Sequence, residues 1–96
     1  MDRIRDLPGL ARKSEEALAR VSIFTVEDLR TIGPVMAFYR LRMLARDAGM
    51  SGPSLNFLYA LVGALANISW LEVAHTQREQ LLAELDSLEQ MERLFA

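Results

Sequence analysis

The fold is decided by the stretch Pro53 to Ala66, which reads PSLNFLYALVGALA. Pro53 suits the first turn of a helix, and the residues after it place apolar side chains on nearly every face. A helix with no polar face must be covered by other helices. The stretch therefore predicts a central helix with Leu58, Leu61 and Leu65 in the core.

One narrow stripe of this helix carries mostly small residues, among them Ala60 and Gly63. Glycine in a helix interior costs roughly 1 kcal/mol, so its presence calls for a compensating contact. Small side chains let a second backbone come close. We expect another segment of the chain to pack directly against this stripe.

Turn and capping residues divide the rest of the chain into further helices. Thr25 with Asp28 predicts a helix start, and Gly33 followed by Pro34 predicts a stop and a new start. Thr76-Gln77-Arg78-Glu79 has the pattern of a capping box before a long last helix that reaches Phe95. No strand pattern is present. The sequence predicts an all-α, compact domain of five to six helices, with expected helices at 12–21, 26–32, 34–48, 53–66 and 77–95.

Length and composition are those of one globular domain. The 96 residues are 51% hydrophobic and 25% charged, which favours a folded chain with one core over a disordered one. We therefore expect a single helical domain over residues 1–96. No apolar run reaches the roughly 18 residues of a membrane span, and we expect a cytoplasmic protein with no membrane contact.

Catalytic and metal-binding residues are scarce. The chain has no cysteine, and His75 is its one histidine. Thiolate ligands, cysteine nucleophiles and paired histidines are thus excluded. We expect His75 to be an exposed turn residue, and we expect no enzymatic activity, no cofactor and no metal ion.

Several apolar side chains allow both a structural and a binding role. Trp70 lies between two predicted helices, where a lone aromatic residue usually fills the joint. Met36, Met43 and Met91 are compatible with an adaptable binding groove, yet methionine at helical spacing usually fills gaps in a core. For all four residues we favour the structural role.

A short hairpin near the N-terminus is the best candidate for a phosphate site. Pro8-Gly9 forms a turn that leads into a helix whose first residues include Arg12 and Lys13. Helix N-termini offer unpaired N–H groups and partial positive charge. The pattern resembles helix-hairpin-helix DNA-binding modules, although Ala11 stands where that pattern has its second glycine. The predicted contacts are Gly9, Ala11, Arg12 and Lys13, with a purely structural hairpin as the alternative.

Charge is distributed unevenly along the chain. Residues 1–46 hold nine Arg or Lys against six acids, a balance of +3, whereas residues 47–96 hold two against seven, a balance of −5. A dedicated nucleic-acid binder usually shows a stronger basic excess. The distribution is compatible with a weakly basic face on an acidic body.

The run Asn56 to Leu65 and the following Trp70 form a specific pattern, and further matching residues lie along roughly residues 5 to 85. By these residues the chain resembles the C-terminal domain of the TfoX/Sxy family of DNA-transformation regulators. Val62 replaces an acid that is usual in the family. The other matching residues are Leu7-Pro8, Ser14, Leu18, Ile23, Thr25, Asp28-Leu29, Ile32-Gly33, Ala37 and Leu41.

The resemblance implies a helical domain related to helix-hairpin-helix folds, within a bacterial regulator of natural transformation. Such a regulator acts on competence-gene transcription together with a cyclic-AMP receptor protein and has no enzymatic activity. Full-length relatives carry an additional N-terminal α+β domain. The chain is therefore expected to be either a stand-alone homologue or a fragment.

These observations favour a regulatory interaction module whose partner is a protein of the transcription machinery or a regulator. Weak, sequence-independent DNA binding is the alternative. The last helix has more apolar surface near its end than a small core can cover. Met91, Leu94 and Phe95 thus predict self-association into a homodimer.

Overall fold

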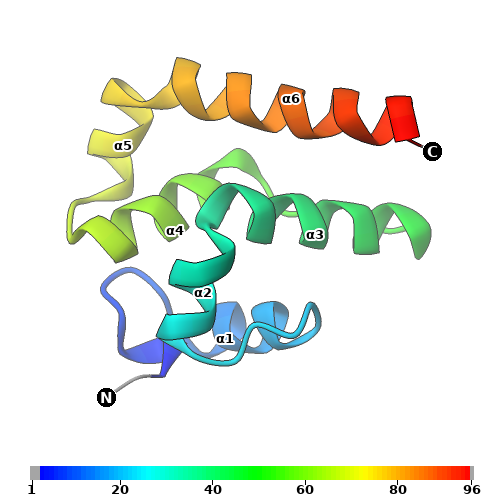
Figure 1. Cartoon of the computed structure of the whole chain (residues 1–96). Helices are drawn as coiled ribbons and strands as arrows, with labels where there is room; N and C mark the ends of the chain where they lie inside the picture. Colours follow the sequence, from blue (N-terminus) through cyan, green and yellow to red (C-terminus); the bar gives the residue numbers. More distant parts are fainter. Residues whose placement is uncertain (1–2, 96) are drawn as a thin grey trace.

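The structure, a computed structural model that describes residues 3–95, is all-α, as predicted. Helices α3 and α4 form a middle layer between α6 on one side and α1 with α2 on the other (Figure 1). Within the described range the elements are the 3₁₀-helix η1 (Ile4–Asp6) and the α-helices α1 (Arg12–Ala19), α2 (Val26–Ile32), α3 (Pro34–Asp47), α4 (Leu55–Ala66), α5 (Trp70–Thr76) and α6 (Arg78–Phe95).

Helix α4 is the central helix that its composition predicts. Leu58 and Leu61 are completely buried, and Tyr59 is nearly so. Leu65, which we expected in the core, is only half-buried and packs against its edge. The helix begins at Leu55, after Ser54 as the N-cap, and not at Pro53.

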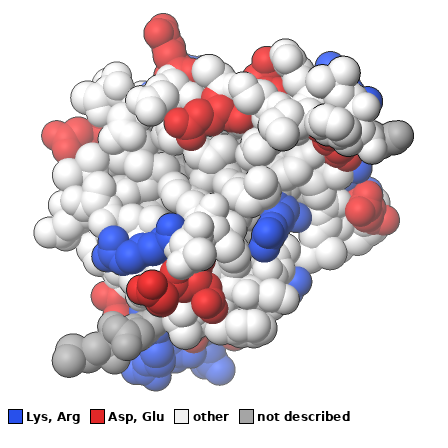
Figure 2. All heavy atoms as spheres, viewed as in Figure 1, with Lys and Arg blue, Asp and Glu red and all other residues white. Residues whose placement is uncertain are grey.

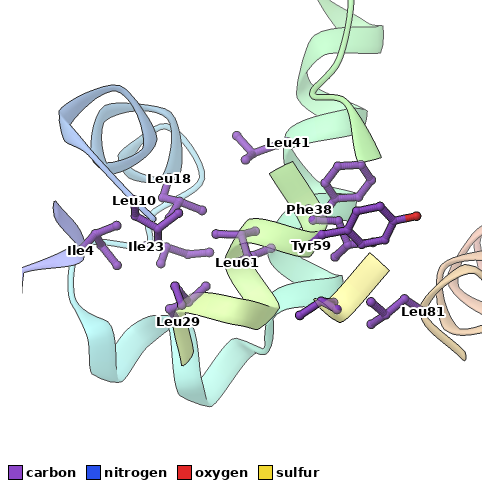
Figure 3. Close-up of a cluster of buried hydrophobic side chains, with 14 of the residues drawn as sticks. Ile4, Leu10, Leu18, Ile23, Leu29, Phe38, Leu41, Tyr59, Leu61 and Leu81 are labelled. Atoms are coloured by element: carbon purple, nitrogen blue, oxygen red, sulfur yellow. The ribbon is translucent and has the colours of Figure 1, made fainter. Parts of the chain in front are cut away.

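The core joins the N-terminal hairpin to the later helices. In the view of Figure 3, Leu61 lies between a group that includes Ile4 and Leu18 and a group that includes Phe38 and Leu81. No polar or charged residue between Arg3 and Phe95 is buried. Hydrophobic packing about α4 therefore holds the two halves of the chain together.

The capping box at the start of α2 is confirmed. The backbone N–H of Asp28 donates to Thr25 Oγ1 at 3.0 Å, and the Thr25 N–H donates to Asp28 Oδ2 at 3.2 Å. A further donor, the Phe24 N–H, lies 3.0 Å from the same carboxylate oxygen. These bonds, led by the one from Phe24, lower the pKa of Asp28. Gly33, with φ of +91°, ends α2 and lets Pro34 begin α3.

The close contact expected at Gly63 is present, and the approaching segment is the turn that follows α4. A Cβ atom on Gly63 would lie 2.5 Å from the carbonyl oxygen of Ile68. The Ile68 N–H donates to the Gly63 carbonyl at 3.0 Å, and Asn67 adopts the left-handed conformation. The chain thus folds back on α4 at a point where only glycine fits.

Two predictions about the segment after α4 are wrong. The connector expected around Trp70 is the short helix α5, because Ser69 Oγ accepts the Glu72 N–H at 3.2 Å and caps a helix there. The capping box expected at Thr76 does not form. Thr76 is the last residue of α5, and its hydroxyl donates to the Glu72 carbonyl at 2.8 Å.

Between Arg3 and Phe95, no single helix is long and apolar enough to cross a membrane. Only α4 and α5 taken together have the length and apolar composition of a membrane span, and this pair is bent by 105° at the turn between the two helices.

The central position of α4 predicts a large effect of truncation. Leu61→Ala should lower the free energy of unfolding by about 2 to 5 kcal/mol, because it leaves a cavity in a close-packed core. Leu94→Ala, at a side chain that is 78% exposed on α6, is the control and should change stability by less than about 0.5 kcal/mol. Chemical denaturation measures both. A folded Leu61→Ala protein of unchanged stability would contradict the central position of α4.

Candidate interaction surfaces

The N-terminal hairpin places the four predicted phosphate contacts close together. Leu7 to Leu10 form a turn closed by the Leu10 N–H, which donates to the Leu7 carbonyl at 3.2 Å, and Gly9 has φ of +81°. Ala11 is extended and precedes α1 without any side-chain cap. The first N–H groups of α1 are therefore open to solvent or to an anion. Gly9, Ala11, Arg12 and Lys13 are all exposed.

Neighbouring acids offset much of the positive charge at this hairpin. Arg5 Nε lies 2.9 Å from Glu15 Oε1, and the Arg5 backbone N–H donates to Glu15 Oε2 at 3.2 Å. The hydrogen bond from the Arg5 side chain, more than any other contact, lowers the pKa of Glu15. Arg12 pairs with Glu16 at 3.3 Å. Lys13 is exposed and has no ion-pair partner within the part of the chain that the structure describes.

From Arg3 onward, the one helical element before the Pro8-Gly9 turn is η1, a single turn from Ile4 to Asp6. Glu15 of α1 accepts hydrogen bonds from Arg5 of η1 and so connects the two elements, which is a structural role. The helix-hairpin-helix assignment remains a prediction.

Trp70 occupies a different environment from the one expected. Its side chain is 41% exposed, so it does not fill the joint between helices. Trp70 is the first residue of α5, and Val73 is the residue of this helix that is completely buried in the core. Trp70 borders a hollow of about 380 Å³, which is also lined by Pro8, Gly9, Ala60, Ala64 and Ile68.

Polar contacts hold the end of α6 against α3. Arg42 Nη1 lies 3.2 Å from Glu89 Oε1, and Arg46 Nη2 lies 3.1 Å from Glu92 Oε1. The Tyr39 hydroxyl also donates to Glu92. This hydrogen bond is the main cause of a lowered pKa at Glu92 and a raised pKa at Tyr39. No sequence pattern predicts these contacts, since the partners lie 46 to 53 residues apart.

The predicted self-association residues are strongly exposed. Met91 is 54% exposed, Leu94 78% and Phe95 83%. Glu89 and Glu92, on the same last turns of α6, face α3. More than half of each of these three apolar side chains is therefore left exposed by residues 3–95.

Among the described residues, no group of three or more His, Cys, Asp or Glu side chains could hold a metal ion. His75 is exposed, as expected, although it lies in the last turn of α5.

Comparison with known proteins agrees with the likeness seen in the sequence. Residues 1–85 match the model of the TfoX C-terminal domain. The chain is 35% identical over 88 residues to the DNA transformation protein TfoX of Haemophilus influenzae. This match covers 92% of the chain but only 38% of the relative's length.

A solved structure is also similar. It is the crystal structure of an uncharacterized protein from Listeria monocytogenes, which has 27% sequence identity and a TM-score of 0.70. The likeness covers 90% of this chain and 92% of that one. Family model, relative and structure agree over nearly the whole chain, which therefore belongs to the TfoX C-terminal domain family.

Proposed function

We propose that the chain is a non-enzymatic regulatory module that serves DNA transformation by binding a protein of the transcription machinery or a regulator. The exposed Trp70 beside a preformed hollow is the observation that carries this proposal. Tryptophan is enriched among the few residues that dominate protein interfaces. Membership of the TfoX family, one member of which is named a DNA transformation protein, supplies the biological context.

The Trp70 hollow suits a protein side chain better than a charged ligand. The residues that line it with Trp70 are uncharged: Pro8, Gly9, Ala60, Ala64, Asn67, Ile68 and Ser69. Leu71, which follows Trp70 in α5, is also exposed, at 53%. An apolar pocket with an aromatic rim is the usual setting of an interface anchor.

A pull-down from the native host, with DNA removed by nuclease, tests this proposal. The wild-type chain should retain a protein partner, and Trp70→Ala should lose it, because the anchor is removed. Phe24→Ala is the matched control, since Phe24 is an aromatic residue that is 60% exposed and does not line the hollow beside Trp70. Loss of all bound protein on nuclease treatment, or equal binding by the Trp70 variant, would refute the proposal.

A second copy of the chain is also a proposed partner. Met91, Leu94 and Phe95 form an uncovered apolar patch, and a two-fold dimer covers it most simply because one surface serves both copies.

Analytical ultracentrifugation measures this self-association. The wild-type chain should dimerise at high micromolar concentration, and Phe95→Glu should shift it to monomer by placing a charge within the apolar contact. A wild-type protein that stays monomeric throughout this range would show that the patch does not self-associate.

Weak, sequence-independent DNA binding is the alternative function. It is favoured by the uncapped start of α1, where Arg12 and Lys13 are exposed. Against it stand the ion pairs of Arg5 with Glu15 and of Arg12 with Glu16. A footprint of about two to four phosphates gives a small electrostatic contribution to affinity.

Fluorescence anisotropy with short duplex DNA at two salt concentrations measures this contribution. We expect binding at the weak end of about 10⁻⁴ to 10⁻⁶ M, with a log–log salt slope of about −2 to −4. An Arg12→Ala, Lys13→Ala double variant should bind still more weakly. Submicromolar binding at physiological salt that the double variant abolishes would make DNA contact the primary function.

A further inference from the structure

A second hollow runs along α6. It has a volume of about 540 Å³ and lies between α6 and the corner where α2 meets α3. Its apolar lining includes Ile32, Pro34, Val35 and Met36 from the corner, and Leu81 and Leu88 from α6. We call this hollow the α6 groove. It shares no lining residue with the hollow beside Trp70.

The length of the α6 groove matches a short helix. Along α6 the lining of the groove extends from Gln77 to Leu88. At 1.5 Å per residue this length is about 16 Å, or three helical turns. Val62 of α4 forms part of its apolar lining. An apolar trough of this length is the shape that accepts the apolar stripe of an amphipathic helix.

The two walls of the α6 groove differ in polarity. Residues 32–36 on one wall are uncharged, whereas Gln77, Gln80, Glu84 and Ser87 form the rim on the other. Glu84, which is exposed, is the one charged residue of the lining. Of the five acids of α6, Glu89 and Glu92 pair with arginines of α3, whereas Glu84 has no ion pair among the described residues. Figure 2 shows acidic side chains over the part of the molecule where α6 lies. The charge of this rim is complementary to a basic flank.

One methionine, Met36, gives the α6 groove an adaptable wall. Met36 lines it and is only half-buried, and none of Met36, Met43 and Met91 belongs to the core, contrary to the structural role expected for them. Met91 and Phe95 follow Leu88 by three and seven residues, so they continue the same face of α6 beyond the groove. Flexible methionine side chains suit a surface that must fit a helix of irregular shape.

We propose that the α6 groove binds an amphipathic helix of a partner protein, about three turns long, with its apolar stripe in the groove and Lys or Arg along the flank beside Glu84. The assignment rests on the proposed function, because it names the chemistry of a protein partner. The α6 groove shares no lining residue with the hollow beside Trp70, so an experiment can refute either binding site without refuting the other.

The probe is a pair of fluorescein-labelled helical model peptides, each about 14 residues long with leucine at helical spacing. One carries lysine along a single flank of the stripe, and the other carries glutamate at the same positions. Anisotropy titrations compare the wild-type chain with Met36→Asp, Glu84→Lys and the control Met50→Asp. Met50 is 68% exposed and lies outside the α6 groove. Circular dichroism confirms that each variant is folded.

The lysine peptide should bind the wild-type chain about tenfold more tightly than the glutamate peptide. Met36→Asp should lose binding, and Met50→Asp should retain it. Glu84→Lys should reverse the preference, and this exposed rim position provides the decisive result if Met36→Asp does not fold. Equal binding of the two peptides, no binding of either, or an unchanged preference in Glu84→Lys overturns the proposal. The proposal is also overturned if sedimentation shows that a second copy of the chain occupies the groove and excludes the peptide.

Discussion

The contact between Gly63 and the Ile68 carbonyl is the constraint on which the later half of the fold depends. A side chain at Gly63 would collide with that oxygen at 2.5 Å, so the turn after α4 can close only over glycine. The turn bends the path of the chain by 105° into α5 and fixes where α6 begins. The same turn places Trp70 at the surface. The turn that requires glycine at position 63 thus helps to determine the position of the proposed anchor.

Helix α6 changes its mode of attachment along its length. Leu81 and Leu85 are buried in the core, whereas the next contacts with α3 are the hydrogen bonds and ion pairs of Glu89 and Glu92. The match to the family model ends at residue 85, where burial in α6 also ends. The last turns of α6 therefore lie beyond the shared core, with one side held by polar contacts and the other exposing Met91 and Phe95.

Local signals in the sequence were sufficient for much of the fold. Composition alone predicted α4, and the pairing of Thr25 with Asp28 predicted the start of α2, because both depend on residues within one helical turn or one helix. Trp70 could not be placed this way, because its exposure depends on the turn at Gly63 and the Ser69 cap. The pairs Arg5–Glu15 and Tyr39–Glu92 were equally inaccessible, since tertiary packing brings them together. The turn motif predicted the exposed residues of the hairpin, but it did not predict that Glu15 and Glu16 pair with the arginines beside it.

The exposure of Trp70 is the claim on which the account of function depends, and the fluorescence of this single tryptophan tests it directly. The folded wild-type chain should show emission between that of a buried and a fully solvated indole, with clear quenching by acrylamide. Blue-shifted emission that resists acrylamide until the chain is denatured would show that Trp70 is a core residue. A buried Trp70 could not anchor a partner protein, which contradicts the proposed function.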